Sequence, residues 1–144
     1  MHTVHHILKA KGDAVLSIAP LETAYHALRK MAKHNVGALL VVDQEKLTGV
    51  FSERDYARKV VLQGKSSKDT PVSEVMTRDV LYIDPHCSIN DCMALMTDKR
   101  VRHLPVMENG ALVGIVTIGD VVKQIISDQE FTIHQLENYI SGTY

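Results

Sequence analysis

Two stretches of the chain repeat the same spacing of apolar side chains. After Pro20 and again after Pro85, apolar residues fall at positions i, i+3, i+4 and i+7, a spacing typical of an amphipathic helix with one buried face. These positions are Ala24, Ala27, Leu28 and Met31 in the first stretch and Ile89, Cys92, Met93 and Met96 in the second. The two sets lie 65 residues apart, so the pattern predicts the same helix face buried twice.

The 65-residue offset extends well beyond these helices. Residues 15–61 align with residues 80–126 without a gap, eleven aligned positions are identical, and many of the remaining apolar positions exchange one apolar residue for another. Each copy is small for an independent domain, so we expect two similar halves packed face to face with pseudo-two-fold symmetry.

Each half is predicted to contain a strand, an amphipathic helix, a β-hairpin and a second helix. The strands are expected at 15–18 and 80–83, the hairpins at 38–51 and 103–116, and the second helices at 55–63 and 120–127. Asn109-Gly110 is the strongest hairpin-turn dipeptide of the chain. Short helices are also expected ahead of each half, at 4–8 and 72–76. The predicted fold class is α/β in the α+β sense, with two β-α-β-β-α repeats.

The repeats set the domain boundaries. We expect a first repeat with its lead-in at 1–63, a polar linker at 64–71 that contains Gly64 and Pro71, and a second repeat at 72–127. The remaining residues, 128–144, form a tail whose apolar spacing predicts a helix.

Charge and composition exclude several classes of protein. Lys+Arg number 16 and Asp+Glu 17, which argues against nucleic acid held by a basic surface. The longest apolar run, 38–42, is far too short to span a membrane, and the first dozen residues contain no signal-peptide core. We therefore expect a cytoplasmic protein that binds neither nucleic acid nor membrane.

A hydroxyl and a carboxylate recur at the end of both hairpins. Ser52 and Asp55 in the first half align with Thr117 and Asp120 in the second. One interpretation is a capping box that stabilises each following helix. The other is a nucleotide site, because a carboxylate can accept hydrogen bonds from ribose hydroxyls while the hydroxyl contacts ribose or phosphate. The spacing leaves both interpretations open.

Other chemistry is weakly represented. The eight histidines are scattered without a metal-ligand spacing, Cys92 aligns with core Ala27, and Cys87 near a helix start leaves a redox role possible. The chain contains no Walker loop, no G-x-G-x-x-G and no G-x-S-x-G. We therefore expect no metal site. We also expect no catalytic site, because a residue pattern that occurs twice favours binding over a single chemical step.

The repeated segments resemble tandem CBS domains, named after cystathionine beta-synthase. Leu47-Thr-Gly-Val-Phe-Ser-Glu-Arg-Asp55 and Leu112-Val-Gly-Ile-Val-Thr-Ile-Gly-Asp120 are similar to the family's closing motif, and residues 72–80 resemble its entry to a repeat. Val101-Arg-His-Leu-Pro-Val106 is similar to the family's central strand. The resemblance covers residues 3–127.

The resemblance implies two adenosine clefts between the halves. It implies that Asp55 and Asp120 bind ribose and that Ser52 and Thr117 contact ribose or phosphate. A phosphate also needs nearby cations, and the sequence offers Arg54 inside the first motif. Further candidates for contact with phosphate are Arg58, Lys59, Arg102 and His103. Candidates for the adenine pocket are Ile18, Gly37, Ala38, Ile83 and Pro105. The copies differ, since Gly119 replaces Arg54, so the two clefts are expected to be unequal.

These features predict a regulatory module that senses an adenine nucleotide and acts in trans on a partner protein. Similar stand-alone pairs favour AMP or NAD(H), with ADP or ATP also possible. The alternative is a structural dimerisation module with vacant clefts. The resemblance also implies a homodimer, because CBS pairs commonly associate through their helices, and the second helices here are rich in apolar residues at 60–62 and 121–126. The alternative is that these residues face only their own sheet.

Overall fold

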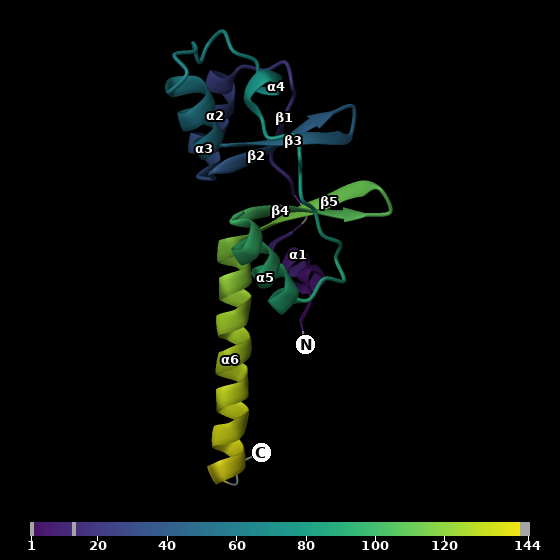
Figure 1. Cartoon of the computed structure of the whole chain (residues 1–144). Coiled ribbons are helices and arrows are strands. Elements are labelled where there is room, and N and C mark those ends of the chain that lie inside the picture. The colour runs from purple at the N-terminus through teal and green to yellow at the C-terminus, as the bar shows by residue number, and fades with distance from the viewer. Residues whose placement is uncertain (1, 13, 142–144) are drawn as a thin grey trace. The chain divides into compact units, whose positions relative to one another are not determined.

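The computed structural model describes residues 2–12 and 14–141 and contains two compact units (Figure 1). Among the described residues, one unit comprises 2–12, 83–106 and 114–141, and the other comprises 14–82 and 107–113. The mixed helix and strand content confirms the predicted α+β class.

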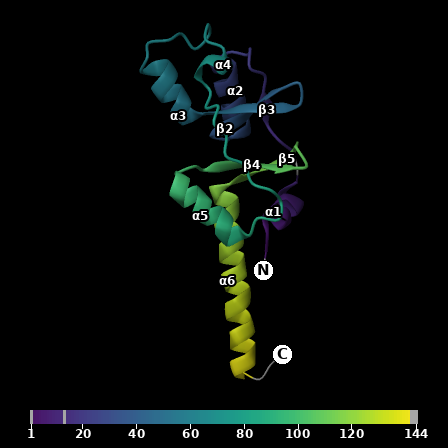
Figure 2. The same ribbon diagram turned by 45° about the vertical axis from the view of Figure 1, so that its right-hand side comes forward.

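The unit built on the first repeat contains a three-stranded sheet in the order β1-β2-β3. Strand β1 (Ser17–Ile18) pairs in parallel with β2 (Ala38–Asp43), and β2 pairs antiparallel with β3 (Lys46–Ser52). Helices α2 (Ala24–His34) and α4 (Val72–Val75) lie on the same side of this sheet (Figures 1 and 2). The core between sheet and helices includes Met31, Leu39, Phe51 and Val72.

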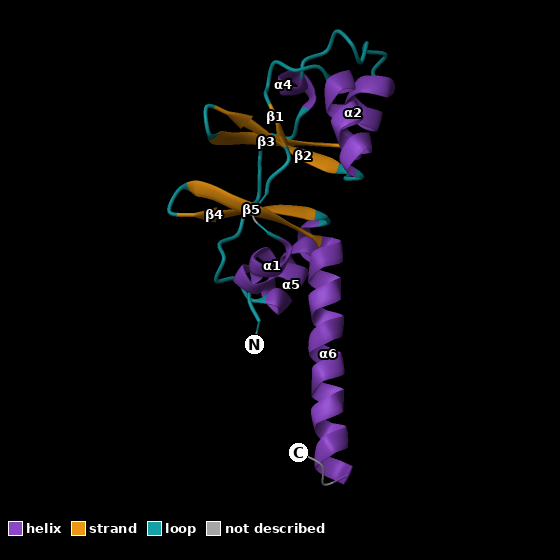
Figure 3. Ribbon diagram, turned by 180° about the vertical axis from the view of Figure 1, so that it is seen from behind, coloured by secondary structure: helices purple, strands orange, loops and turns teal. Residues whose placement is uncertain are grey.

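The unit built on the second repeat repeats this plan with one strand fewer. Strands β4 (His103–Glu108) and β5 (Ala111–Thr117) form a hairpin, of which residues 103–106 and 114–117 belong to this unit. Helices α1 (Val4–Lys11) and α5 (Ile89–Lys99) lie beside it together with the start of α6 (Ile118–Ser141), as Figure 3 shows. The structure thus confirms the predicted lead-in helices, amphipathic helices and both hairpins.

The predicted strand at 80–83 is wrong. Only Ile83 pairs there, in a single bridge with Val106, and its N–H donates to the Pro105 carbonyl at 3.0 Å. In the first repeat the Leu40 N–H donates to Leu16 O at 3.3 Å. Pro105 aligns with Leu40, and proline has no N–H to donate, so the ladder cannot continue in the second repeat.

The closing helices of the two repeats also differ from the expected pair. The first begins earlier than predicted, as a short helix α3 (Glu53–Asp55) that continues as a π-helix, η1 (Tyr56–Val61). The second is one uninterrupted helix, α6, which joins the predicted helix at 120–127 to the tail. The part of the predicted tail at 142–144 lies outside the described residues.

The two lead-in helices are exchanged between the repeats. Helix α1 precedes the first repeat in sequence but lies in the unit of the second, whereas α4 precedes the second repeat and lies in the unit of the first. The backbone amides of Val4 and His5 donate to carbonyls of Cys87 and Pro85, and the Val72 amide donates to Glu22 O. Each spatial unit is therefore completed by the lead-in of the other repeat.

Candidate functional site

Each hairpin ends in a capping box. In the first repeat the Ser52 N–H donates to Asp55 Oδ2 at 3.0 Å, and the Asp55 N–H donates back to Ser52 Oγ at 3.1 Å. In the second repeat the Thr117 N–H and the Asp120 N–H make the equivalent bonds at the same distances. The duplicated residues therefore have the capping role that their spacing indicated, and they place one carboxylate at the same position of each unit.

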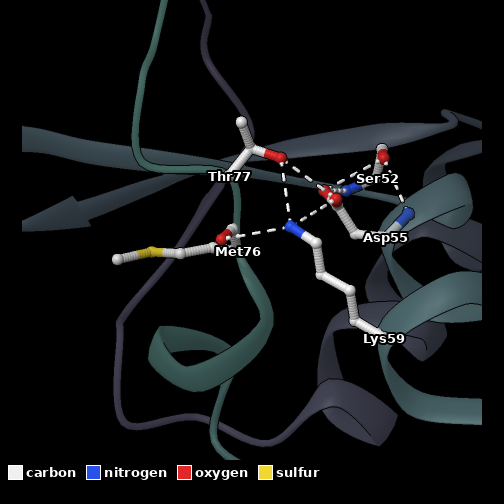
Figure 4. Close-up of polar contacts among 5 residues, drawn as sticks. All are labelled: Ser52, Asp55, Lys59, Met76 and Thr77. Atoms are coloured by element: carbon white, nitrogen blue, oxygen red, sulfur yellow. Dashed lines mark hydrogen bonds and ion pairs between the residues drawn. The ribbon is translucent and has the colours of Figure 1, made fainter. Parts of the chain in front are cut away.

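The carboxylate of Asp55 is enclosed (Figure 4). Its residue is only 8% exposed, Thr77 Oγ1 donates to its Oδ1 at 3.0 Å, and Lys59 Nζ lies 3.1 Å from the same oxygen. The Lys59 ammonium also lies 3.5 Å from Met76 O and from Thr77 Oγ1. Lys59 thus neutralises Asp55, and Thr77 comes from the segment that follows α4.

The carboxylate of Asp120 is more open and has a different cation. Lys11, the last residue of α1, lies 2.7 Å from Asp120 Oδ2 and donates to Ile115 O at 3.1 Å. Burial raises the pKa of Asp120, but hydrogen bonds from Lys11 and Thr117, together with the lysine charge, outweigh burial and hold that pKa below its usual value. Asp120 is therefore an anion at neutral pH with one lysine beside it.

A glycine lets each lead-in segment approach its motif. A Cβ on Gly49 would lie 2.6 Å from Met76 Sδ and 2.8 Å from Thr77 O. A Cβ on Gly114 would lie 2.6 Å from Leu8 Cδ2. The glycine shared by the two motifs therefore serves the contact with the exchanged lead-in, which brings Thr77 to Asp55 and Lys11 to Asp120.

The other candidate residues fall into two groups. Ala38 pairs directly with Ser52, and the Glu53 N–H donates to Gly37 O at 3.0 Å, so both small residues adjoin the first motif. At the equivalent place in the second repeat, the Ile118 N–H donates to Arg102 O at 2.9 Å, and His103 is the next residue. Ile18, Ile83 and Pro105 are buried, whereas the Arg54 and Arg58 side chains are exposed.

The structure adds two residues that the sequence did not single out for the site, Lys11 and Thr77.

The structure gives neither cysteine a reactive environment. Burial, then the charges of Asp91 and Asp84, raise the pKa of Cys87, and burial with the nearby Cys87 raises the pKa of Cys92 to about 12. Among residues 2–12 and 14–141, no group of three or more His, Cys, Asp or Glu side chains is placed to hold a metal ion. Over the same residues, no helix has the length and apolar character needed to cross a bilayer.

Comparison with known proteins gives one consistent family. The sequence model of the CBS domain matches twice, at residues 12–62 and 72–127. A mitochondrial CBS domain-containing protein of Arabidopsis thaliana, CBSX3, is 38% identical over 99% of this chain and 73% of its own length. The Bacillus subtilis protein YhcV, also named as CBS domain-containing, is 37% identical over 80% of this chain and 81% of its own.

A solved structure agrees with these relatives. A putative signal-transduction protein with CBS domains from Burkholderia ambifaria superposes with a TM-score of 0.85 at 50% identity, covering 88% of this chain and 96% of that one. A match over 88% of the chain is long enough to include residues of both repeats.

Proposed function

The chain belongs to the CBS-domain family, whose members are generally regulatory modules, and we propose that it binds an adenine nucleotide and passes that signal in trans to a partner protein. The observation that carries the proposal is the pair of motif carboxylates, each placed identically by a hydroxyl residue and each accompanied by a lysine. An ionised carboxylate can accept both hydroxyls of a ribose, and an adjacent ammonium can meet phosphate.

The two carboxylates are proposed to differ as ligand sites. Asp55 already accepts hydrogen bonds from Ser52 and Thr77 in addition to its contact with Lys59. A quarter of the Asp120 side chain is exposed. Within the part of the chain that the structure describes, its one ion pair is with Lys11. A ribose at Asp120 would need only the flexible Lys11 side chain to turn aside, toward a phosphate. Asp120 is therefore the carboxylate that we expect to bind more readily.

The ligands to test are AMP and NAD(H), with ADP and ATP as further candidates. Hydrogen bonds to a charged group contribute roughly 1.5–3 kcal/mol, so Asp55→Asn or Asp120→Asn should weaken binding at its own site by about 10- to 100-fold. Glu53→Gln is the matched control, because Glu53 is an exposed carboxylate beside the first motif. Titration calorimetry on the folded variants measures the effect, and wild-type affinity in both single variants and in the double variant would reject the ribose role.

A phosphate role for Arg54 can be tested separately. Its guanidinium is exposed beside Asp55, and arginine suits phosphate oxygens because it can donate two parallel hydrogen bonds. Arg54→Ala should cost more affinity for NAD(H) or ADP than for adenosine. An equal loss for all three would mean that Arg54 supports the fold rather than a phosphate.

One observation favours the alternative, a structural dimerisation module with vacant clefts. Each motif carboxylate already has a lysine partner within its own chain, so both are satisfied without a ligand. The thermal midpoint separates the two functions, because a ligand that binds only the folded chain must raise that midpoint. A thermal midpoint that is unchanged by AMP, NAD(H), ADP and ATP would reject nucleotide binding and favour the structural role.

We also propose that the module works as a homodimer. Val61 at the end of the first closing helix, Leu62 directly after it, and Val122 and Ile126 of the second closing helix are exposed apolar residues, whereas Val60 and Val121 belong to the core. Light scattering that returns the mass of one chain at micromolar concentration would reject self-association. The cytoplasmic location expected from the sequence stays a prediction, since one relative is named as mitochondrial.

A further inference from the structure

Helix α6 carries a second apolar face that its own unit leaves uncovered. Its first turns pack through Val121 and the half-buried Ile125, and the helix contacts α5 and α1 there. The rest of the helix continues past α1 and α5 (Figure 3). A different stripe of side chains, about a quarter turn around the helix from Val121, runs along its whole length.

The stripe has the spacing of a coiled-coil seam. Its members alternate by four and three residues, which is the seven-residue repeat of paired helices. They are Val122, Ile126, Gln129, Ile133, Leu136 and Ile140. The five apolar members are 41%, 49%, 55%, 57% and 83% exposed in chain order. A stripe this long and this apolar on one helix is typical of a surface that another helix covers.

We propose that α6 pairs with α6 of a second copy of this chain, antiparallel, around a two-fold axis that crosses the stripe midway between Gln129 and Ile133. This inference rests on the self-association proposed above and is independent of nucleotide binding. The three isoleucines of the stripe occupy one of the two seam positions of the seven-residue repeat, and Val122, Gln129 and Leu136 occupy the other. In this register each isoleucine faces a residue of the other position on the second copy. Ile126 faces Leu136, Ile133 faces Gln129 and Ile140 faces Val122, and each of these layers occurs twice.

The charges beside the stripe select the antiparallel orientation. Lys123, Glu130 and Glu137 occupy the same flanking position in three successive repeats and are all exposed. Antiparallel pairing brings Lys123 of each copy beside Glu137 of the other, which gives two opposite-charge contacts, and it brings the two copies of Glu130 together at the axis, which gives one like-charge contact. The two attractive contacts outnumber the single repulsive one. Parallel pairing would instead place Ile118, Ile125 and Thr132 of the second copy beside these three charges, and no ion pair would form.

The N-terminal end of α6 has a groove that can bind the C-terminal end of α6 from the second copy. A shallow groove there is lined by Arg102, Ile118, Gly119, Val122, Lys123 and Ile126. Antiparallel pairing lays Ile140 of the second copy against Val122 in this groove, where Gly119 leaves space. The last carbonyls of that helix, which carry partial negative charge, would then lie near the Arg102 and Lys123 cations.

A pair of variants tests whether the stripe forms the interface. Light scattering on the wild-type chain should give twice the 16.0 kDa of one chain at micromolar concentration. Ile133→Lys with Leu136→Lys places two charges in the seam at exposed positions, so the fold should stay intact and dimerisation should weaken by more than about 100-fold. Phe131→Ser is the matched control, since Phe131 is 66% exposed on another side of the helix, and it should leave the dimer unchanged.

Charge exchange tests the orientation. Lys123→Glu and Glu137→Lys should each weaken the dimer by about 10-fold, and the double variant should recover wild-type affinity, because the two opposite-charge contacts reform with reversed sign. Single variants without effect, or a double variant without recovery, overturn the antiparallel pairing.

The remaining outcomes separate this inference from the proposals on which it rests. A dimer that survives Ile133→Lys with Leu136→Lys overturns pairing through α6 and leaves self-association standing. A wild-type chain that stays monomeric overturns both. Nucleotide affinity measured on the same variants reports on the motif aspartates alone, whichever result the mass measurement gives.

Discussion

The ammonium of Lys11 lies 2.7 Å from the carboxylate of Asp120 and joins two residues that are 109 positions apart in the chain. The same ammonium donates to Ile115 O at 3.1 Å. In the other unit the Thr77 N–H donates to the equivalent carbonyl, Val50 O, at 2.8 Å, and the Thr77 hydroxyl donates to Asp55. In the unit of the second repeat, one lysine side chain thus replaces the backbone amide and the hydroxyl of Thr77 that serve the unit of the first repeat.

Replacing Lys11 should reduce the fall in the free energy of unfolding that accompanies protonation of Asp120 at acid pH. In the wild type the pKa of Asp120 is lowered, so its contribution is present above the usual carboxyl pKa and is lost as pH falls through the lowered value. Lys11→Met should therefore cost about 0.5–1 kcal/mol of unfolding free energy at pH 7 and less once Asp120 is protonated, when only the hydrogen bond to Ile115 O is left to lose. Urea unfolding at several pH values measures the difference, with Lys9→Met of the same helix as control. An equal loss at all pH values would mean that Lys11 acts through packing and its bond to Ile115 O, and not through the Asp120 charge.

The two motif glycines should tolerate alanine unequally. Gly49→Ala forces a Cβ against the Thr77 carbonyl as well as the Met76 side chain, so it should destabilise the protein by about 1–3 kcal/mol. Gly114→Ala meets only the flexible end of Leu8 and should cost less. Gly119→Ala is the control, because its Cβ would meet nothing closer than 3.7 Å in a helix, where alanine is favoured over glycine by roughly 0.5–1 kcal/mol. The ranking can be read from denaturant midpoints, and a Gly49→Ala variant as stable as wild type would refute the close approach.

Removing the hydroxyl that reaches Asp55 should destabilise the first unit. Thr77→Val deletes the donor to a buried carboxylate while keeping the side-chain shape, so we expect a loss of about 1–2 kcal/mol. Thr97→Val is matched to it, because the Thr97 hydroxyl donates only to Met93 O within its own helix at an exposed site. Thermal unfolding should separate the two variants. Equal midpoints would mean that water replaces the Thr77 contact at no cost.

Both thiols should react slowly in the folded protein. The thiolate is the nucleophile, and the pKa of Cys92 near 12 and the raised pKa of Cys87 leave both protonated at neutral pH. A disulfide reagent should label Cys87 slowly, label Cys92 only after unfolding, and lose its earlier phase in Cys87→Ser. Fast labelling of native Cys87 would restore the redox role that the sequence left open.

The regular elements were predictable wherever local spacing determines them. The i, i+3, i+4, i+7 pattern identified α2 and α5, and the apolar runs around short polar turns identified both hairpins. The strand at 80–83 was mispredicted because its apolar residues copy those at 15–18, while its partner contains Pro105 in place of Leu40. Strand formation depends on the neighbour's free N–H, which a single-segment pattern does not contain.

The candidate site was predictable only for the residues close together in sequence. The capping pairs Ser52–Asp55 and Thr117–Asp120 follow from a three-residue spacing. The partners Lys11 and Thr77 come from segments that the duplication assigns to the opposite repeat, so the spacing of the motif carries no trace of them. Whether these residues bind a nucleotide stays a prediction that the titrations above address.

The exchange of lead-in helices has a consequence for how this chain can be inherited. A gene fragment cut at residue 71 would separate α4 from the sheet that it covers and would give the first repeat a helix, α1, that belongs to the other unit. The smallest piece that can move intact between proteins is therefore the pair of repeats and not the single copy. A substitution that alters the sheet of one repeat changes the packing of a lead-in helix encoded with the other repeat, so the two copies cannot vary independently at these contacts.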